Sequence, residues 1–166
     1  MYKIDILRGF YYMLKVSLIE FVLRIIPESF LFLLAAYVFA NKKIEKKLYI
    51  ISGFIIAISM YFIRLLPIQF GIHSVIGVII VILVAVNINK IPTSKAISSA
   101  VMIIIFEGIF ETINLVFIDK VLNLNVQAVL SDSVSKLVYF APSLIILGCS
   151  IGLFNILVNN KKNKIL

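Results

Sequence analysis

The chain alternates between long apolar stretches and short polar links. Each stretch holds about 18 or more mostly apolar residues, the length a helix needs to cross a hydrocarbon core of roughly 30 Å. None shows the strict alternation of a membrane β-strand, and backbone inside a bilayer must satisfy its own hydrogen bonds. We therefore predict an all-α, polytopic transmembrane helical bundle of five spans. The predicted spans are residues 18–40, 48–66, 70–88, 96–118 and 137–158.

The first 40 residues allow two arrangements, because their N-terminal part is both apolar and charged. With five spans, residues 1–17 lie outside the first span, and residues 4–17 form an amphipathic helix in the outer interface. With six spans, residues 4–26 cross the membrane once and the chain turns at residues 27–29. Residues 30–40 then return as a short or tilted helix.

Lysines gather in the links that fall on one side of the membrane if the spans alternate. They are Lys42, Lys43, Lys46, Lys47, Lys90, Lys95, Lys161, Lys162 and Lys164. Cytoplasmic loops are rich in lysine and arginine, so we expect this side and the C-terminus to be cytoplasmic, in a bacterial plasma membrane. A formal net charge of +8 suits membrane lipid as a partner, and we expect no nucleic acid partner.

The composition agrees with a membrane environment. Hydrophobic residues make up 62% of the 166 residues and charged residues 14%, whereas soluble domains average about half and about a quarter. We find no internal repeat or linker in the sequence and predict one domain over residues 1–166. The sequence carries no nucleotide-binding glycine loop, zinc-binding helix or serine elbow. We therefore expect no catalytic residues, no cofactor and no metal site.

The fourth apolar stretch contains Glu107, Glu111 and Asn114, which spacings of four and three place on one face of a helix. An acidic group at the centre of a span costs about 2.5–3.5 kcal/mol to insert, so such groups normally face other helices, a cavity or a partner. One interpretation is an inter-helix hydrogen bond or ion pair that holds the bundle together. The other is a polar pocket that faces outward.

Depth along the spans bears on the pocket hypothesis. At 1.5 Å per residue from the inner ends of their spans, Arg64 lies about 24 Å up, Glu111 about 22 Å and Glu107 about 16 Å. Glu28 and His73 fall in the same outer half. We therefore expect these five groups to converge, with Arg64 as the counter-ion of Glu111. The alternatives are a snorkelling Arg64, an interfacial His73 and a Glu28 that only serves its helix's first turn.

Small residues mark two predicted helix-packing faces. Gly148 and Gly152 form a Gly-x-x-x-Gly pattern in the fifth span, and Gly53 and Ala57 form a weaker version in the second. Such faces permit close helix contact, here within the chain or between subunits. Cys149 lies beside the first face, and we expect it to be a small packing residue.

Two segments carry a family resemblance. The first is Ile26-Pro27-Glu28-Ser29-Phe30, and the second is Ile63-Arg64-Leu65-Leu66-Pro67-Ile68-Gln69-Phe70-Gly71-Ile72-His73. With the lysines that follow the first span, they resemble the membrane-embedded sensor region of bacterial receptor histidine kinases of the accessory-gene-regulator and sporulation type. The resemblance covers most of the chain as a layout of spans. It implies a helical bundle that receives a peptide or other extracellular signal and passes it to a kinase.

The sequence holds neither the phosphorylatable-histidine helix nor the ATP-binding motif of such kinases. We therefore expect a non-enzymatic sensor or accessory module, or a fragment, that works with a separate histidine kinase or another membrane subunit. Its signal would be a peptide or a small molecule. The alternative is a small-solute transport component resembling the substrate-binding membrane subunit of an energy-coupling-factor transporter. A third interpretation is a packing scaffold whose buried carboxylates only pair with one another.

Overall fold

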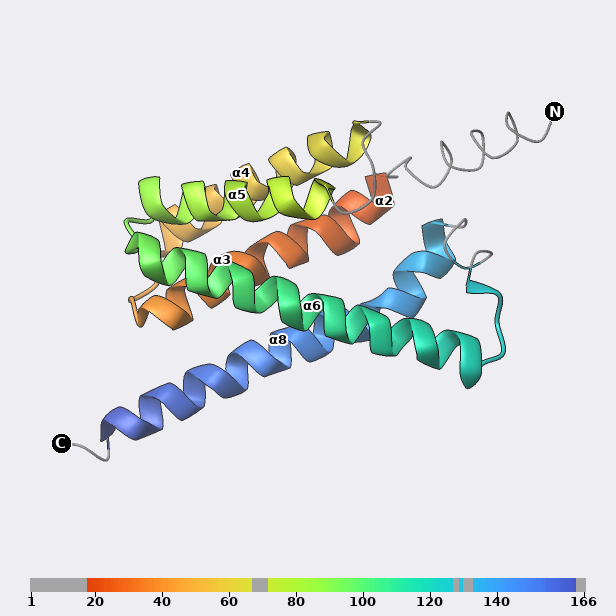
Figure 1. Cartoon of the computed structure of the whole chain (residues 1–166). Helices are drawn as coiled ribbons and strands as arrows, with labels where there is room; N and C mark the ends of the chain where they lie inside the picture. Colours follow the sequence, from red (N-terminus) through yellow and green to blue (C-terminus); the bar gives the residue numbers. More distant parts are fainter. Residues whose placement is uncertain (1–17, 67–71, 127–128, 130–132, 164–166) are drawn as a thin grey trace.

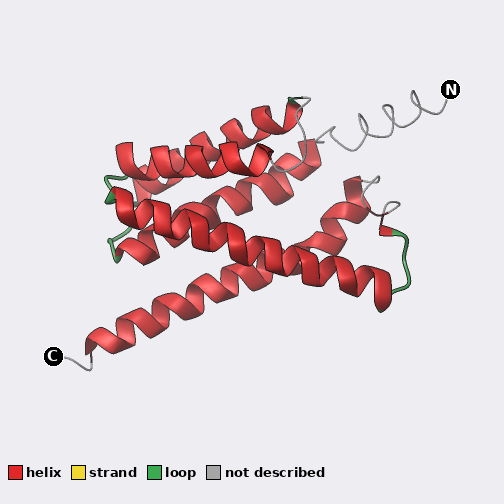
Figure 2. Cartoon of the chain, viewed as in Figure 1, coloured by secondary structure: helices red, strands yellow, loops and turns green. Residues whose placement is uncertain are grey.

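A computed structural model of the chain describes residues 18–66, 72–126, 129 and 133–163, and every regular element in these residues is a helix (Figure 2). The elements are α2 (Leu18–Glu20), η1 (Phe21–Ile25), α3 (Ile26–Ala40), α4 (Lys46–Leu65), α5 (Ile72–Asn87), α6 (Thr93–Lys120) and α8 (Ser133–Asn163). The all-α prediction is thus confirmed for the described residues.

The helical run from α2 through α3 is continuous, so the predicted chain reversal at residues 27–29 is wrong. Pro27 has no N–H to donate and would break a regular helix from inside. Here the helix widens into the π-helical turn η1, in which the Ile26 N–H donates to the Phe21 carbonyl five residues back. Pro27 then occupies the first turn of α3, where its missing donor costs little. The predicted amphipathic helix at residues 4–17 lies outside the described residues.

Three of the described helices are long and apolar enough to cross a membrane, which indicates a membrane protein. They cover Lys46–Leu65, Thr93–Lys120 and Leu137–Ile156, and α5 is equally apolar but has only 16 residues. Large apolar side chains also cover the outside of the bundle, as Phe62 shows at 62% exposed. A surface of this kind fits lipid better than water.

Helix α3 forms the centre of the bundle and contacts α4, α5, α6 and α8 (Figure 1). Leu33 and Ala36 are fully buried there. The helix ends where Asn41 adopts a left-handed φ of 50° and donates its N–H to the Tyr37 and Val38 carbonyls. Asparagine tolerates this conformation at a helix end, so the chain can turn toward α4.

The two lysine-bearing links, between α3 and α4 and between α5 and α6, lie at the same end of the bundle, and α8 runs toward that end (Figure 1). Lys42 Nζ donates to the Asn89 carbonyl at 2.6 Å and so ties the two links together. At the opposite end, Val129 is buried against Ile118 and Phe140. The link after α6 therefore contributes a residue to a small core.

A buried polar network joins α3 and α4 to the α5–α6 link at the lysine-bearing end. The Tyr37 hydroxyl donates to Asn89 Oδ1 at 2.7 Å, and Asn89 Nδ2 donates to Ser52 Oγ at 2.8 Å. All three side chains are essentially inaccessible. Because each polar atom in the network has a partner, burial of these groups carries little penalty.

Two of the predicted small-residue contacts are present and one is not. A Cβ built on Gly53 would lie 2.5 Å from the Phe30 ring, and one on Gly148 would lie 3.4 Å from Leu31. Ala57 is fully buried. A Cβ on Gly152 would meet nothing within 4 Å among the described residues, and Cys149 is exposed. Gly152 therefore has no close contact within the described residues and Cys149 lies on the surface, so packing of this face between subunits stays a prediction.

Candidate functional site

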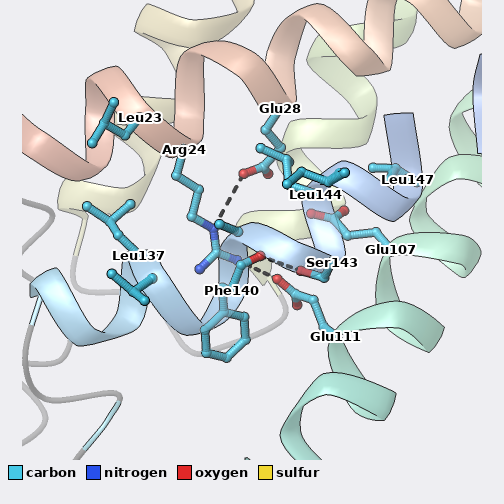
Figure 3. Close-up of a pocket in the computed structure, with 13 residues that line it drawn as sticks. Leu23, Arg24, Glu28, Glu107, Glu111, Leu137, Phe140, Ser143, Leu144 and Leu147 are labelled. Carbon is cyan, nitrogen blue, oxygen red and sulfur yellow. Dashed lines mark hydrogen bonds and ion pairs between the residues drawn. The ribbon is translucent and has the colours of Figure 1, made fainter. Parts of the chain in front are cut away.

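Five charged side chains from three long helical segments meet inside the bundle. Arg24 forms an ion pair with Glu111, and its Nε lies 3.7 Å from Glu28 Oε2. Arg64 Nη2 donates to Glu28 Oε1 at 2.7 Å. Glu107 interacts electrostatically with both arginines and with the other two glutamates. We call these five residues the charged cluster, four of which Figure 3 shows.

Local structure explains how the charged cluster forms. The spacing of four between Arg24 and Glu28 places both on one side of the helix that runs through η1 into α3. The same spacing aligns Glu107 and Glu111 on α6. Arg64 lies in the last turn of α4, which packs directly on α3, and therefore reaches Glu28.

A cavity of about 420 Å³ lies beside the charged cluster. One wall carries the polar groups, and α8 supplies a mostly apolar wall opposite them (Figure 3). The lining residues are Leu23, Arg24, Glu28, Glu107, Glu111, Leu137, Val138, Phe140, Ala141, Ser143, Leu144, Ile145 and Leu147. Small-molecule sites have volumes of about 300–1,000 Å³ and combine apolar walls with a few polar groups, so the cavity has the size and chemistry of such a site.

Arg24 is held on several sides at the cavity wall. Its guanidinium lies 5.2 Å from the centroid of the Phe140 ring, within the range of a cation–π contact. Figure 3 shows the guanidinium between the carboxylates of Glu28 and Glu111. Arg24 therefore links η1 to α3, α6 and α8 at once.

Glu28 is the most deeply buried member of the charged cluster for which an ion pair is described. Its side chain is only 6% exposed. Oε1 accepts the Arg64 hydrogen bond, but Oε2 is buried and accepts no hydrogen bond from the described residues. Buried carboxylate oxygens normally have a donor, whereas the described cationic nitrogen paired with this atom is Arg24 Nε at 3.7 Å, beyond hydrogen-bond distance.

The rim of the cavity is apolar and accessible. Within the described residues, Leu23 is 60% exposed, Val138 63% and Ile145 65%. Apolar side chains on η1 and α8 therefore surround the accessible mouth of the cavity.

The structure confirms that Glu28, Arg64, Glu107 and Glu111 converge, but it changes their pairing. We predicted Arg64 as the counter-ion of Glu111, whereas Arg64 pairs with Glu28 and Arg24 pairs with Glu111. Arg64 does interact through space with Glu107 and Glu111. The predicted pairing is wrong because similar height in the bundle does not fix which way a side chain points around its helix.

His73 and Asn114 are not among the residues that line the cavity. His73 Nδ1 lies 3.1 Å from the Ile63 carbonyl oxygen at the start of α5. Asn114 Nδ2 donates to the Tyr139 carbonyl at 2.6 Å and joins α6 to α8. The predicted place of His73 in the pocket is therefore wrong, and Asn114 acts as a helix–helix contact next to it.

Arg24 is the member of the charged cluster that the sequence analysis missed. Its spacing of four from Glu28 was the available signal, since an oppositely charged pair at that spacing shares one helix face. Within the described residues, no group of three or more histidine, cysteine, aspartate or glutamate side chains has a metal-binding arrangement. The chemistry of the site is that of hydrogen-bond acceptors, ion pairs and an apolar wall.

No protein-family model, curated protein or solved structure shows significant similarity to this chain. The resemblance to receptor histidine kinase sensors stays a prediction, and residues 67–71 of its more specific segment lie outside the described residues.

Proposed function

We propose that the chain is a small integral membrane protein whose five long helical segments all cross the bilayer and that it binds a small ligand in the cavity. In this proposal it acts as a non-enzymatic sensor or accessory module. The end with the lysine-bearing links faces the cytoplasm, and so does the C-terminal end of α8. The run from Leu18 to Ala40 tolerates its charges because Arg24 and Glu28 pair inside the bundle and do not face lipid.

The observation that carries the proposal is a cavity walled by buried charged groups. A network that served packing alone would be expected to close on itself, because each unpaired buried acceptor costs about 1–3 kcal/mol. Here the buried Glu28 Oε2 accepts no hydrogen bond from the described residues, and Glu107, which also lines the cavity, has no ion pair among them. Space next to an unused acceptor favours a ligand site over a purely structural network.

The ion pairs suggest how ligand binding would change the bundle. Arg24 contacts Glu28 and Glu111, so a ligand that binds either carboxylate competes for the same guanidinium. A ligand shifts a conformational equilibrium by as much as its affinities for the two states differ. If the Arg24–Glu111 ion pair between η1 and α6 were weakened, α8 could move relative to both helices. The cytoplasmic end of α8 would then carry the change to a partner subunit, such as a separate histidine kinase.

The test is ligand-dependent stabilisation of the purified protein in lipid nanodiscs. We expect a peptide or small-molecule fraction from the source cells to raise the unfolding temperature, measured by circular dichroism at 222 nm. Ala141→Trp, which adds bulk at the cavity wall, should abolish the rise. Cys149→Trp adds the same bulk on α8 at an exposed position that does not line the cavity, and should retain it. Equal responses of the two variants, or none in the unmodified protein, would refute the proposal.

A partly open site of small-molecule size also favours a second candidate, a substrate-binding subunit of a transporter. Cross-linking in native membranes separates the two functions. A sensor or accessory module should be captured with a histidine kinase, and a transport subunit with an ATPase pair. Glu107→Gln and Glu111→Gln should alter the response of a sensor, and an unchanged response in both would exclude that role.

A further inference from the structure

We infer that the ligand of this cavity is an amphiphilic organic cation that enters from the lipid. The inference rests on the proposed ligand-binding function and names the chemical class of its ligand.

The first argument is the charge of the wall. The charged cluster has two arginines and three glutamates, so one carboxyl group is left without an arginine counter-ion. Arg24 and Arg64 are engaged by Glu111 and Glu28, and the described residues give Glu107 no ion pair. A buried carboxyl group without a counter-ion is neutralised by a proton or by a bound cation, because an unbalanced buried charge is costly. A cation can take the place of that proton, whereas an anion would only add negative charge.

The second argument is the hydrogen-bonding character of the free groups. Glu107 contributes a carboxyl group to the cavity wall and has no ion pair among the described residues. The guanidinium of Arg24 at this wall is already directed at carboxylates (Figure 3), and Arg64 donates to Glu28 behind it. Ammonium groups supply N–H donors and positive charge together, which suits a carboxyl group without an ion pair.

The third argument is the apolar remainder of the cavity. Leu137, Leu144 and Leu147 project from α8 toward the charged cluster and provide a hydrocarbon wall. A small inorganic cation would leave this surface without a contact. A ligand with a charged head and an apolar body would fill this part of the cavity and gain van der Waals contacts with the wall.

The fourth argument is the route of entry. The described rim residues Leu23, Val138 and Ile145 are each at least 60% exposed and apolar. They lie where acyl chains surround the proposed membrane helices. An amphiphile already dissolved in the bilayer reaches this mouth laterally, with its apolar body still in hydrocarbon and its charged head directed toward Glu28 and Glu107.

The experiment compares two probes of nearly the same shape and opposite charge, tetraphenylphosphonium and tetraphenylborate. Binding to the protein in nanodiscs is measured by equilibrium dialysis, with empty nanodiscs subtracted. We expect saturable binding of the phosphonium only, with a rise of a few degrees in unfolding temperature. Glu107→Gln should weaken it roughly tenfold or more, which corresponds to about 1.4 kcal/mol. Asp119→Asn makes the same change in charge on an exposed residue of α6 and should have no effect.

The possible results separate the inference from the proposed function. If both probes bind and Ala141→Trp abolishes their binding, the choice of a cation is overturned and the ligand site stays in place. Phosphonium binding that Glu107→Gln leaves unchanged would have the same meaning. If neither probe shows saturable binding but cell fractions still stabilise the protein, only the inference is overturned. If the stabilisation by cell fractions is also absent, both the inference and the proposed function are overturned. Should Glu107→Gln fail to fold, loss of phosphonium binding in Ala141→Trp with retention in Cys149→Trp supports the site without altering any charge.

Discussion

Arg24 and Glu111 form an ion pair although 87 residues separate them in the sequence. The pair connects η1 with the middle of α6 across the wall of the cavity (Figure 3). The other described ion pair of Arg24 is with Glu28 on the same helical run, and its Nε and Oε2 atoms are 3.7 Å apart. The pair is therefore one of the contacts that hold η1 against the bundle, together with the Phe21–Tyr61 ring contact.

Replacing either partner should destabilise the bundle, and the two effects should not add. Arg24→Gln and Glu111→Gln should each lower the free energy of unfolding by about 1–3 kcal/mol, as expected for hydrogen bonds to charged groups. The double variant should lose clearly less than the sum, because the second change removes a charge that has no partner left. Unfolding in mixed detergent micelles, followed by circular dichroism, measures all three. Strict additivity would show that the pair carries no coupling energy.

Glu28→Gln should be more destabilising than Glu111→Gln. The Glu28 side chain is 6% exposed and faces two arginines, whereas Glu111 is 29% exposed and pairs with one. Removing the charge of Glu28 leaves two guanidinium groups with weaker partners inside the bundle. The same unfolding assay ranks the variants, and the opposite order would mean that Arg24 and Arg64 do not depend on Glu28 for their position.

Asparagine side chains two residues apart should respond very differently to truncation. Asn89→Ala should lower the free energy of unfolding by about 1–3 kcal/mol, because it leaves the buried Tyr37 hydroxyl and Ser52 without partners. Asn87→Ala is the matched control, since Asn87 is exposed and only bonds the Leu83 carbonyl of its own helix. Tyr37→Phe should fall between them. Equal effects of the two asparagine variants would contradict the buried network.

Gly53→Ala should destabilise the protein by about 1–3 kcal/mol, because its new Cβ would lie 2.5 Å from the Phe30 ring. That ring is confined by edge-to-face contacts with Tyr49 and Phe54 and cannot simply rotate away. Gly152→Ala meets no neighbour in the described structure and should be neutral or raise helix stability by up to about 1 kcal/mol. Phe30→Leu should rescue Gly53→Ala. The unfolding temperatures of Gly53→Ala, Gly152→Ala and the Gly53→Ala, Phe30→Leu double variant test this prediction.

The helices themselves were predictable from the apolar stretches. The second predicted span, residues 48–66, corresponds to Lys46–Leu65, and the fifth, residues 137–158, to the longer Ser133–Asn163. The ends differ because hydrophobicity stops at the first polar residues while backbone hydrogen bonding continues through them. The convergence of Glu107 and Glu111 with Glu28 followed from periodicity and depth.

What could not be predicted depends on rotation and on local irregularity. Depth places Arg64 level with Glu111, but only the azimuth of α4 directs it to Glu28. The widened turn before Pro27 has no reliable sequence signature, and a proline there equally suggested a chain reversal. Arg24 belongs to that turn, so its partner in α6 became evident only from the folded arrangement.

The π-helical turn of η1 also determines where this helix can change length. Since the Ile26 N–H reaches back five residues, the turn holds one residue more than a regular helix requires. Deleting one residue there would close the wide turn into a regular α-helical turn, and the residues on either side would keep their faces because the bulge had absorbed the extra residue. A single-codon deletion in this stretch would thus preserve both the helix and the direction of its side chains, which makes it a site where the chain can change length without losing the fold.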